Sequence, residues 1–224
     1  EPNIKKNLEI ISGDICDQNL VSKLVKNVDV IFHLAALISI PYSYVSPRSY
    51  ISTNIMGTLN LLEASRNSNV ELFVQTSTSE VYGSSQYSPI DEQHPLNAQS
   101  PYAATKIAAD QLALSYYRSF DLPVSIIRPF NTFGPRQSLR AFIPTIITQI
   151  LSSKKKIKLG NLNSKRDFSY ISDTVRGFTS CIGKKRCLGQ AINLGTGVVF
   201  SMQETLNLIT EYIGKDVICE IDKK

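Results

Sequence analysis

The chain has 224 residues, of which 42% are hydrophobic, and its formal charge is +5. This length and composition predict a globular protein of one large domain or a domain and a half. No apolar run approaches the roughly 20 residues of a membrane span, and no aromatic residues interleave a basic stripe, so we expect neither a membrane nor a nucleic-acid partner. Scattered cysteines and only two histidines predict that no metal is bound, and the lack of a signal-like segment predicts a cytoplasmic protein.

The first half of the chain alternates short apolar runs with amphipathic patterns, which is typical of strands that alternate with helices. Asp17 is placed to cap the first of these helices. The expected strands are 8–12, 28–34, 70–74 and 124–127, and the expected helices are about 18–26, 46–67 and 101–120. Mostly apolar strands in this order predict an α/β fold with a parallel, doubly wound sheet covered on both faces.

The helix over 46–67 is expected to carry one apolar stripe, made of Ile51, Ile55, Leu59 and Leu62, and to follow a loop at 41–44. The pattern changes after residue 130. Helices are expected at about 141–151, 172–182 and 201–213, and strands at 157–159 and 191–194. We therefore predict two parts, 1–130 and a smaller region at 131–224, with the strand near 190–194 returning to the main sheet.

Polar side chains gather where the strand at 70–74 ends, because Thr78, Ser79 and Glu80 follow it closely. Ligands of open α/β sheets bind outside the carboxyl ends of the strands. Ser100 and Pro101 begin the next helix, so Tyr102 and Lys106 share a face of its first turns. An ammonium beside a phenol stabilises the phenolate, which predicts a lowered Tyr102 pKa and a base near neutral pH.

A strand followed by a glycine-rich turn and a helix, the usual opening of a dinucleotide-binding sheet, is absent from this sequence. A sheet without that unit leaves neighbouring strand edges unpaired and apolar surface exposed. We therefore expect the native chain to be longer than the sequence given.

Six motifs in one order resemble the extended short-chain dehydrogenase/reductases, and specifically the NAD-dependent nucleotide-sugar epimerases and dehydratases with their Rossmann-type fold. A finer similarity, carried by 37–44, 129–138 and 143–149, is to 4,6-dehydratases that act on nucleotide-linked N-acetylglucosamine in legionaminic-acid synthesis. The motifs are Gly13-Asp14-Ile15, His33-Leu34-Ala35-Ala36, Asn54-x-x-Gly57-Thr58-x-Asn60-Leu61-Leu62, Thr78-Ser79-Glu80-Val81-Tyr82-Gly83, Tyr102-x-x-x-Lys106 and Arg128-Pro129-x-Asn131.

The resemblance implies an NAD site and a nucleotide-sugar site. It assigns the adenine end of NAD to Asp14 and Ile15, the passage of its phosphates and ribose to Leu34, Ala35 and Ala36, and the nicotinamide ribose to Tyr102, Lys106 and Pro129. It assigns the substrate to Thr78, Asn131, Arg166 and, more weakly, Arg136. From the residues alone, Asp14 also suits a turn or cap, Asn54 a structural helix position and His33 a satisfied strand end.

The implied reaction begins when Tyr102 takes the proton of the sugar's C4 hydroxyl during oxidation by NAD, with Thr78 and Lys106 holding the reacting groups. The 4-keto group acidifies C5, Glu80 removes that proton, and the C6 hydroxyl leaves. Many hexose 4,6-dehydratases have an aspartic acid at the position of Ser79, and serine is a poor general acid.

Three alternatives therefore stay open: a UDP-glucuronate decarboxylase, a nucleotide-sugar 4-epimerase, and a catalytically silent nucleotide-sugar-binding remnant. The choice between UDP and GDP also stays open. The resemblance further implies a homodimer in which the helices around 46–67 and 101–120 pair with their copies; two helices that only cover their own sheet are the alternative.

Overall fold

A computed structural model describes residues 7–152 and 156–221 of the chain. The chain forms two compact units. The first consists of Glu1–Ser84, Pro95–Ile126 and Ile182–Ala191, and the second of Ser85–His94, Ile127–Cys181 and Ile192–Lys224. The division falls within two strands of the largest sheet. No helix among the described residues is long and apolar enough to cross a membrane.

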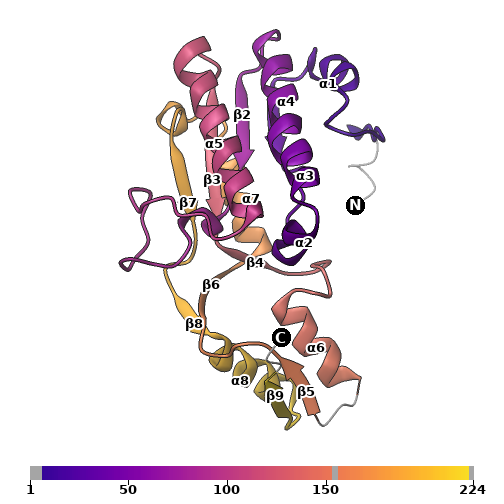
Figure 1. The fold of residues 1–224 in the computed structure, drawn as a ribbon, viewed down its shortest axis with the longest axis vertical. Coiled ribbons are helices and arrows are strands. Elements are labelled where there is room, and N and C mark those ends of the chain that lie inside the picture. Colours follow the sequence, from indigo (N-terminus) through magenta and orange to yellow (C-terminus); the bar gives the residue numbers. More distant parts are fainter. Residues whose placement is uncertain (1–6, 153–155, 222–224) are drawn as a thin grey trace. The chain divides into compact units, whose positions relative to one another are not determined.

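In the described part of the chain, the largest sheet has four strands, and they are parallel where the hydrogen bonds are recorded (Figure 1). β1 pairs with β2 so that Val30 lies opposite Leu72 and His33 opposite Gln75. Between β3 and β7, the bonds from Gly189 N to Val124 O (2.7 Å) and from Ile126 N to Gln190 O (2.9 Å) advance in one direction. The predicted parallel α/β sheet is confirmed; its strand order is β1 (Val30–His33), β2 (Leu72–Thr76), β3 (Val124–Pro129), β7 (Ala191–Leu194).

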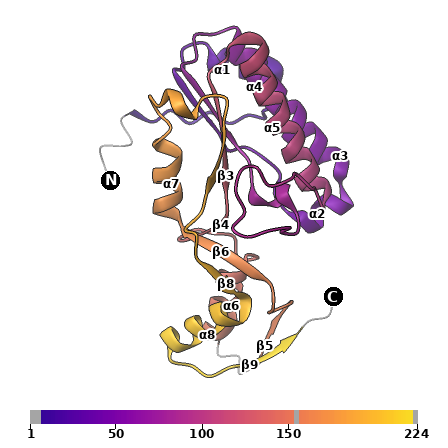
Figure 2. The same ribbon diagram turned by 90° about the vertical axis from the view of Figure 1, so that its left-hand side faces the viewer.

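Two helices of the first unit begin and end close to where the sequence predicts. The Asp17 carboxylate accepts from Asn19 N and Leu20 N at the start of α1 (Gln18–Val25), as expected. The Ser100 hydroxyl accepts from Ala103 N at 3.1 Å and begins α5 (Pro101–Phe120). α5 and α4 (Gly57–Arg66) lie side by side (Figure 2). These caps satisfy backbone N–H groups that otherwise have no partner.

The predicted helix over 46–67 is interrupted by a π-helical turn. α3 (Pro47–Tyr50) runs into η2 (Ile51–Met56), where Gly57 N donates to Ser52 O, a bond across five residues. The extra residue rotates the preceding side chains, so the single apolar stripe is wrong: Ile51 is 49% exposed, whereas Leu62 is fully buried. The expected loop at 41–44 is also wrong, because α2 (Ile40–Val45) is helical there.

The expected strand at 8–12 does not form among the described residues. Leu8, Ile10 and Ile11 are 57%, 84% and 47% exposed. A strand needs a neighbour for its backbone N–H and C=O groups, and the segment has no recorded strand partner within the described ranges. Without such a partner, this apolar segment does not form a strand.

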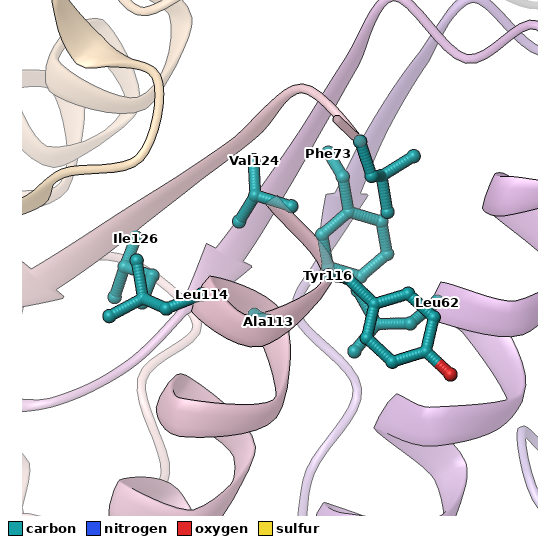
Figure 3. Close-up of a cluster of buried hydrophobic side chains, with 8 residues drawn as sticks. Leu62, Phe73, Ala113, Leu114, Tyr116, Val124 and Ile126 are labelled. Carbon is teal, nitrogen blue, oxygen red and sulfur yellow. The ribbon is translucent and has the colours of Figure 1, made fainter. Parts of the chain in front are cut away.

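One apolar cluster joins the two helices to the sheet. Phe73 of β2 and Val124 and Ile126 of β3 pack against Leu62 of α4 (Figure 3). From α5 the cluster receives Ala113, Leu114 and Tyr116. Because buried contacts hold these strands and helices together, the polar residues at the carboxyl end of β2 are attached to a well-packed part of the fold.

Among its described residues, the second unit contains two small sheets and three helices. A three-stranded sheet has the order β4 (Asn131–Phe133), β6 (Lys165–Tyr170), β8 (Val199–Ser201), and β5 (Lys156–Leu159) pairs with β9 (Ile218–Ile221). The sequence predicted β5 but not β4, β6, β8 or β9. The helices are α6 (Phe142–Leu151), α7 (Ile171–Thr179) and α8 (Met202–Ile213), the last begun by a capping box of Ser201 and Glu204. A short 3-10 turn, η4 (Lys185–Cys187), lies in the first unit.

Candidate active site

A tight turn at the end of β2 presents Thr78, Ser79 and Glu80. Thr78 caps the 3-10 turn η3 (Ser79–Tyr82), and its hydroxyl accepts from Glu80 N at 3.2 Å. Gly83 ends the turn at φ 65°, and an added Cβ would stand 2.2 Å from Asn97 O. A larger residue does not fit there, so this tight turn requires glycine.

Tyr102 reaches the same turn from the first residues of α5. Its phenol is 7% exposed and forms a hydrogen bond with the Thr78 side chain. Burial raises the pKa of Tyr102 to about 12; the Thr78 bond lowers it, and the negative charges of Glu80 and Asp110 raise it further. The predicted lowering of this pKa is wrong for this structure, because desolvation outweighs any help from a cation.

Lys106 lies one turn further along α5 and is 4% exposed. Its Nζ donates to Thr76 O at the end of β2 over 2.5 Å. Burial lowers the pKa of Lys106 to about 8, and the charge of Asp110 opposes that fall. The ammonium is thus held at the strand end, and a modest change in its surroundings decides whether it is charged near neutral pH.

Asp110 is a buried carboxylate that the sequence analysis missed. It is fully buried, and the Ser77 hydroxyl donates to its Oδ2 over 2.7 Å. Its spacing of four residues from Lys106, which places both on one helix face, is the sequence signal that could have found it.

His33 and Asn54 are buried and hydrogen-bonded near the site. The Thr58 hydroxyl donates to Asn54 O at 2.6 Å, so it accepts from His33 Nε2 at 2.9 Å, which assigns the ring proton to Nε2. Burial, and next the charge of Lys106, lower the pKa of His33 to about 3, so the ring is neutral. Asn54 bonds both backbone groups of Leu37 and the Thr105 hydroxyl. The structural interpretation of both residues is confirmed.

The segment at 14–16 lies against the start of α4. Asp14 Oδ1 accepts from Cys16 N at 2.8 Å, and Asp14 O accepts from Asp17 N at 3.0 Å, which makes Asp14 a turn residue in this structure. Asn60 Nδ2 donates to Ile15 O at 3.0 Å. An added Cβ on Gly57 would stand 2.4 Å from Ile15 Cδ1, so glycine allows this close packing.

The residues that follow β1 are open to solvent. Leu34 is 63% exposed, Ala35 is also exposed, and Ala36 is half-buried. Small side chains at the carboxyl end of a parallel strand let a ligand approach the backbone closely.

The remaining candidate residues belong to the second unit. Asn131 begins β4, where it lies opposite Phe168 of β6, and Pro129 precedes it at the end of β3. Arg166 of β6 is half-buried, and one guanidinium N–H donates to Lys165 O at 2.9 Å. Arg136 is exposed and has φ 68°, an uncommon conformation outside glycine.

Asp167, next to Arg166, holds the turn before β8. Its carboxylate accepts from Thr196 N at 3.0 Å, Thr196 Oγ1 at 2.7 Å and Gly197 N at 2.8 Å. Sequence reasoning did not single it out. The three bonds fix the strand from which Arg166 projects.

The chain is similar to nucleotide-sugar dehydratases and epimerases. A family model described as GDP-mannose 4,6 dehydratase matches residues 1–224. The low-salt glycan biosynthesis protein Agl12 of Haloferax volcanii is 35% identical over 93% of this chain and 67% of its own. The dTDP-glucose 4,6-dehydratase DesIV of Streptomyces venezuelae, solved with NAD bound, has a TM-score of 0.87 and 31% identity over 94% of this chain and 66% of its own.

A UDP-glucuronic acid 4-epimerase of Bacillus cereus, in complex with UDP-glucuronic acid and NAD, has a TM-score of 0.89. It is 31% identical, and the match covers 96% of this chain and 68% of the epimerase. The chain thus spans about two thirds of the length of these relatives. Both dehydratases and epimerases share its fold.

Proposed function

Because the chain belongs to the GDP-mannose 4,6 dehydratase family, we propose that it is part of an NAD-dependent nucleotide-sugar 4,6-dehydratase. The observation that carries this proposal is the group formed by Thr78, Glu80 and Tyr102 near the end of β2. The Tyr102 phenol bonds the Thr78 side chain, the Thr78 hydroxyl accepts from Glu80 N, and the charge of Glu80 acts on the phenol. The proposed substrate is UDP- or GDP-linked N-acetylglucosamine, as in the dehydratases of legionaminic-acid synthesis. The proposed division of labour is an NAD-binding part at 1–130 and a nucleotide-sugar part at 131–224.

The side chains at the end of β2 fit the sugar end of NAD. The Tyr102 hydroxyl and the Lys106 ammonium are donors suited to ribose hydroxyls, and the small side chains of Ala35 and Ala36 leave the end of β1 open. Pro129 is assigned to the nicotinamide ribose as well. At the adenine end we assign Asp14, whose carboxylate is exposed, with Ile15; Leu34 to Ala36 take the passage between the two ends. When bound, NAD supplies the hydride acceptor and donor that the reaction needs.

The chain's own residues move the protons. Tyr102 accepts the proton of the C4 hydroxyl as that carbon is oxidised, and Thr78 orients the hydroxyl through the bond that it makes with Tyr102. The 4-keto group acidifies C5, and Glu80 takes the C5 proton. The C6 hydroxyl leaves as water with a proton returned by Glu80, directly or through Ser79. The sugar loses one water in total. When bound, NAD would return to C6 the hydride taken from C4, and C5 would regain a proton through Glu80, which balances the proton that Tyr102 took from the C4 hydroxyl.

Residues of the second unit are assigned to the substrate. Arg166 suits the diphosphate, because a guanidinium matches phosphate oxygens in shape and charge. Asn131 is assigned to the same group, and Arg136 is the weaker candidate because it is exposed on a loop.

Ser79 favours a second candidate function. A serine hydroxyl is a poor acid for expelling the C6 hydroxyl, whereas a 4-epimerase needs no such acid and a UDP-glucuronate decarboxylase loses carbon dioxide instead. The structural similarity to a UDP-glucuronic acid 4-epimerase supports the same alternative. The alternative of another class is a silent nucleotide-sugar-binding remnant.

We also propose a homodimer built on α5 and the helices before it. An apolar pocket of about 240 Å³ is lined by Pro47, Ile51, Ile55, Pro101, Ala104 and Thr105. Ile51 is 49% exposed and Met56 47%, which is costly for surface that stays in water. Sedimentation analysis of wild type and Ile51→Glu tests the dimer: the variant should sediment as a monomer, and a monomeric wild type would refute the proposal.

The test of the reaction is incubation of the full-length protein with UDP-N-acetylglucosamine, its GDP counterpart and UDP-glucuronate, followed by mass spectrometry. We expect a product from an N-acetylglucosamine nucleotide that is lighter by one water, about 18 Da, and absent with Glu80→Gln. Loss of carbon dioxide from UDP-glucuronate, with no turnover of either N-acetylhexosamine nucleotide, would reverse the ranking. An isomer of unchanged mass, detected by NMR, would establish an epimerase, and no NAD binding in calorimetry would establish the silent protein.

A further inference from the structure

Asp110 is a buried carboxylate for which the proposed reaction has no use. It follows Lys106 by four residues and Tyr102 by eight on α5, so the three side chains lie along one helix face. All three residues are at least nine-tenths buried. A carboxylate in such a place is costly unless it is hydrogen-bonded and near an opposite charge.

Two consecutive residues at the end of β2 bind this face. Thr76 O accepts from Lys106 Nζ at 2.5 Å, and the Ser77 hydroxyl donates to Asp110 Oδ2 at 2.7 Å. The strand end is therefore tied to α5 twice, once through the ammonium and once through the carboxylate. Thr78, which bonds Tyr102, is the next residue along the same turn.

We propose that Asp110 is a positioning residue that keeps the Lys106 ammonium charged and seated at the end of β2, while Ser77 holds the carboxylate in place. The inference rests on the proposed function only in giving Lys106 a ligand, the nicotinamide ribose. It assigns a second task to the helix that carries the proposed base.

The charges around Lys106 favour this role over a purely structural one. Burial lowers the pKa of Lys106 to about 8, and Asp110 is the charge that raises it. His33, which also senses Lys106, is neutral, and Glu80 and Tyr50 act on Tyr102. Asp110 also raises the pKa of Tyr102, behind burial and Glu80. Asp110 raises the pKa of Lys106, which favours the charged ammonium, and raises the pKa of Tyr102, which disfavours the phenolate. These two effects fall in different pH ranges, so a pH profile separates them.

The test compares wild type with Asp110→Asn, which keeps the side-chain size and an oxygen for Ser77 but removes the charge. NAD affinity is measured by calorimetry between pH 6.5 and 9. If the Lys106 pKa falls by about one unit, its charged fraction at pH 7.5 falls about threefold, and NAD binding should weaken by that factor. The midpoint at which affinity declines should move about one pH unit toward acid.

Ser77→Ala keeps the charge and loses one hydrogen bond, so its midpoint should move in the same direction by less. An unchanged midpoint in both variants would show that the pair is only structural. A rate profile whose acid limb alone moves to lower pH would show that Asp110 acts through Tyr102 instead. Either result overturns the proposal.

A second measurement without ligand keeps this inference separate from the proposed function. Wild-type unfolding free energy should begin to rise with pH near 8, where folded Lys106 loses its proton, and the rise in Asp110→Asn should begin about one unit lower. If wild type binds no NAD, the proposed function fails while this comparison still tests the coupling. If wild type binds NAD but the onset does not move, only the inference fails.

Discussion

Replacing Lys106 by methionine should stabilise the fold at neutral pH while removing the proposed NAD contact. The ordinary lysine pKa of 10.5 and the folded value of about 8 differ by about 2.5. Each unit is about 1.36 kcal/mol, so the charged folded form is disfavoured by about 3 kcal/mol. Methionine has a similar length and no charge. The lost bond to Thr76 O returns about 1 kcal/mol of that gain.

The net expectation is a Lys106→Met variant about 2 kcal/mol more stable than wild type at pH 7. The sign follows from proton binding: between the two pKa values the unfolded chain holds more protons than the folded chain, so wild-type stability rises with pH. Integration predicts a wild-type rise of about 1 kcal/mol between pH 7 and 9, absent from the variant.

Urea unfolding followed by far-UV circular dichroism at pH 7, 8 and 9 measures both quantities. Lys26→Met is the matched control, because Lys26 is exposed at the end of α1, and its effect should stay within about 0.5 kcal/mol. A wild-type stability that is flat over this range, or a Lys106→Met variant less stable than wild type at pH 7, would contradict the reasoning.

Two further substitutions probe the base on which the site stands. Asn54→Ala removes three hydrogen bonds of a buried side chain and should lower the free energy of unfolding by about 2–4 kcal/mol. Asn67→Ala, which loses one exposed bond to Glu63 O, should cost less than about 0.5 kcal/mol. Equal effects in urea melts would refute the role given to Asn54. Phe73→Ala empties the centre of the apolar cluster and should cost about 3–5 kcal/mol, with thermal unfolding as the measurement; a loss below about 1 kcal/mol would mean that the cluster is not the core.

Local residue chemistry predicted the parts of the fold that depend on few neighbours. Asp17 and Ser100 mark helix starts because a side-chain oxygen there satisfies backbone N–H groups, whatever the rest of the chain does. The apolar runs at 28–34, 70–74 and 124–127 became parallel strands because each found a neighbouring strand in the main sheet. The run at 8–12 has the same apolar pattern but forms no strand. Whether a run becomes a strand depends on a neighbouring strand, which the sequence of one segment does not specify.

The site was predictable in its membership and not in its electrostatics. Spacing placed Tyr102 and Lys106 on one face and Thr78 and Glu80 at the strand end, and the structure brings Tyr102 to Thr78. The sign of the Tyr102 pKa shift depends on burial, which is a property of the packed molecule. Asp110 escaped notice because a single aspartate within a helix reads as a surface residue until its burial is known.

The π-helical turn at Ile51–Met56 also bears on how this protein tolerates changes in length. An α-helix advances about 100° per residue, so removing one residue from the turn would restore regular helical bonding and rotate everything before it by about that angle. The backbone would remain helical, but Tyr50, which is fully buried and donates to Ser39 O, would leave its place. Single-residue deletions at 51–53 should therefore give proteins that stay helical but lose the packing of the segment before the turn. Circular dichroism alone would not distinguish such variants from wild type.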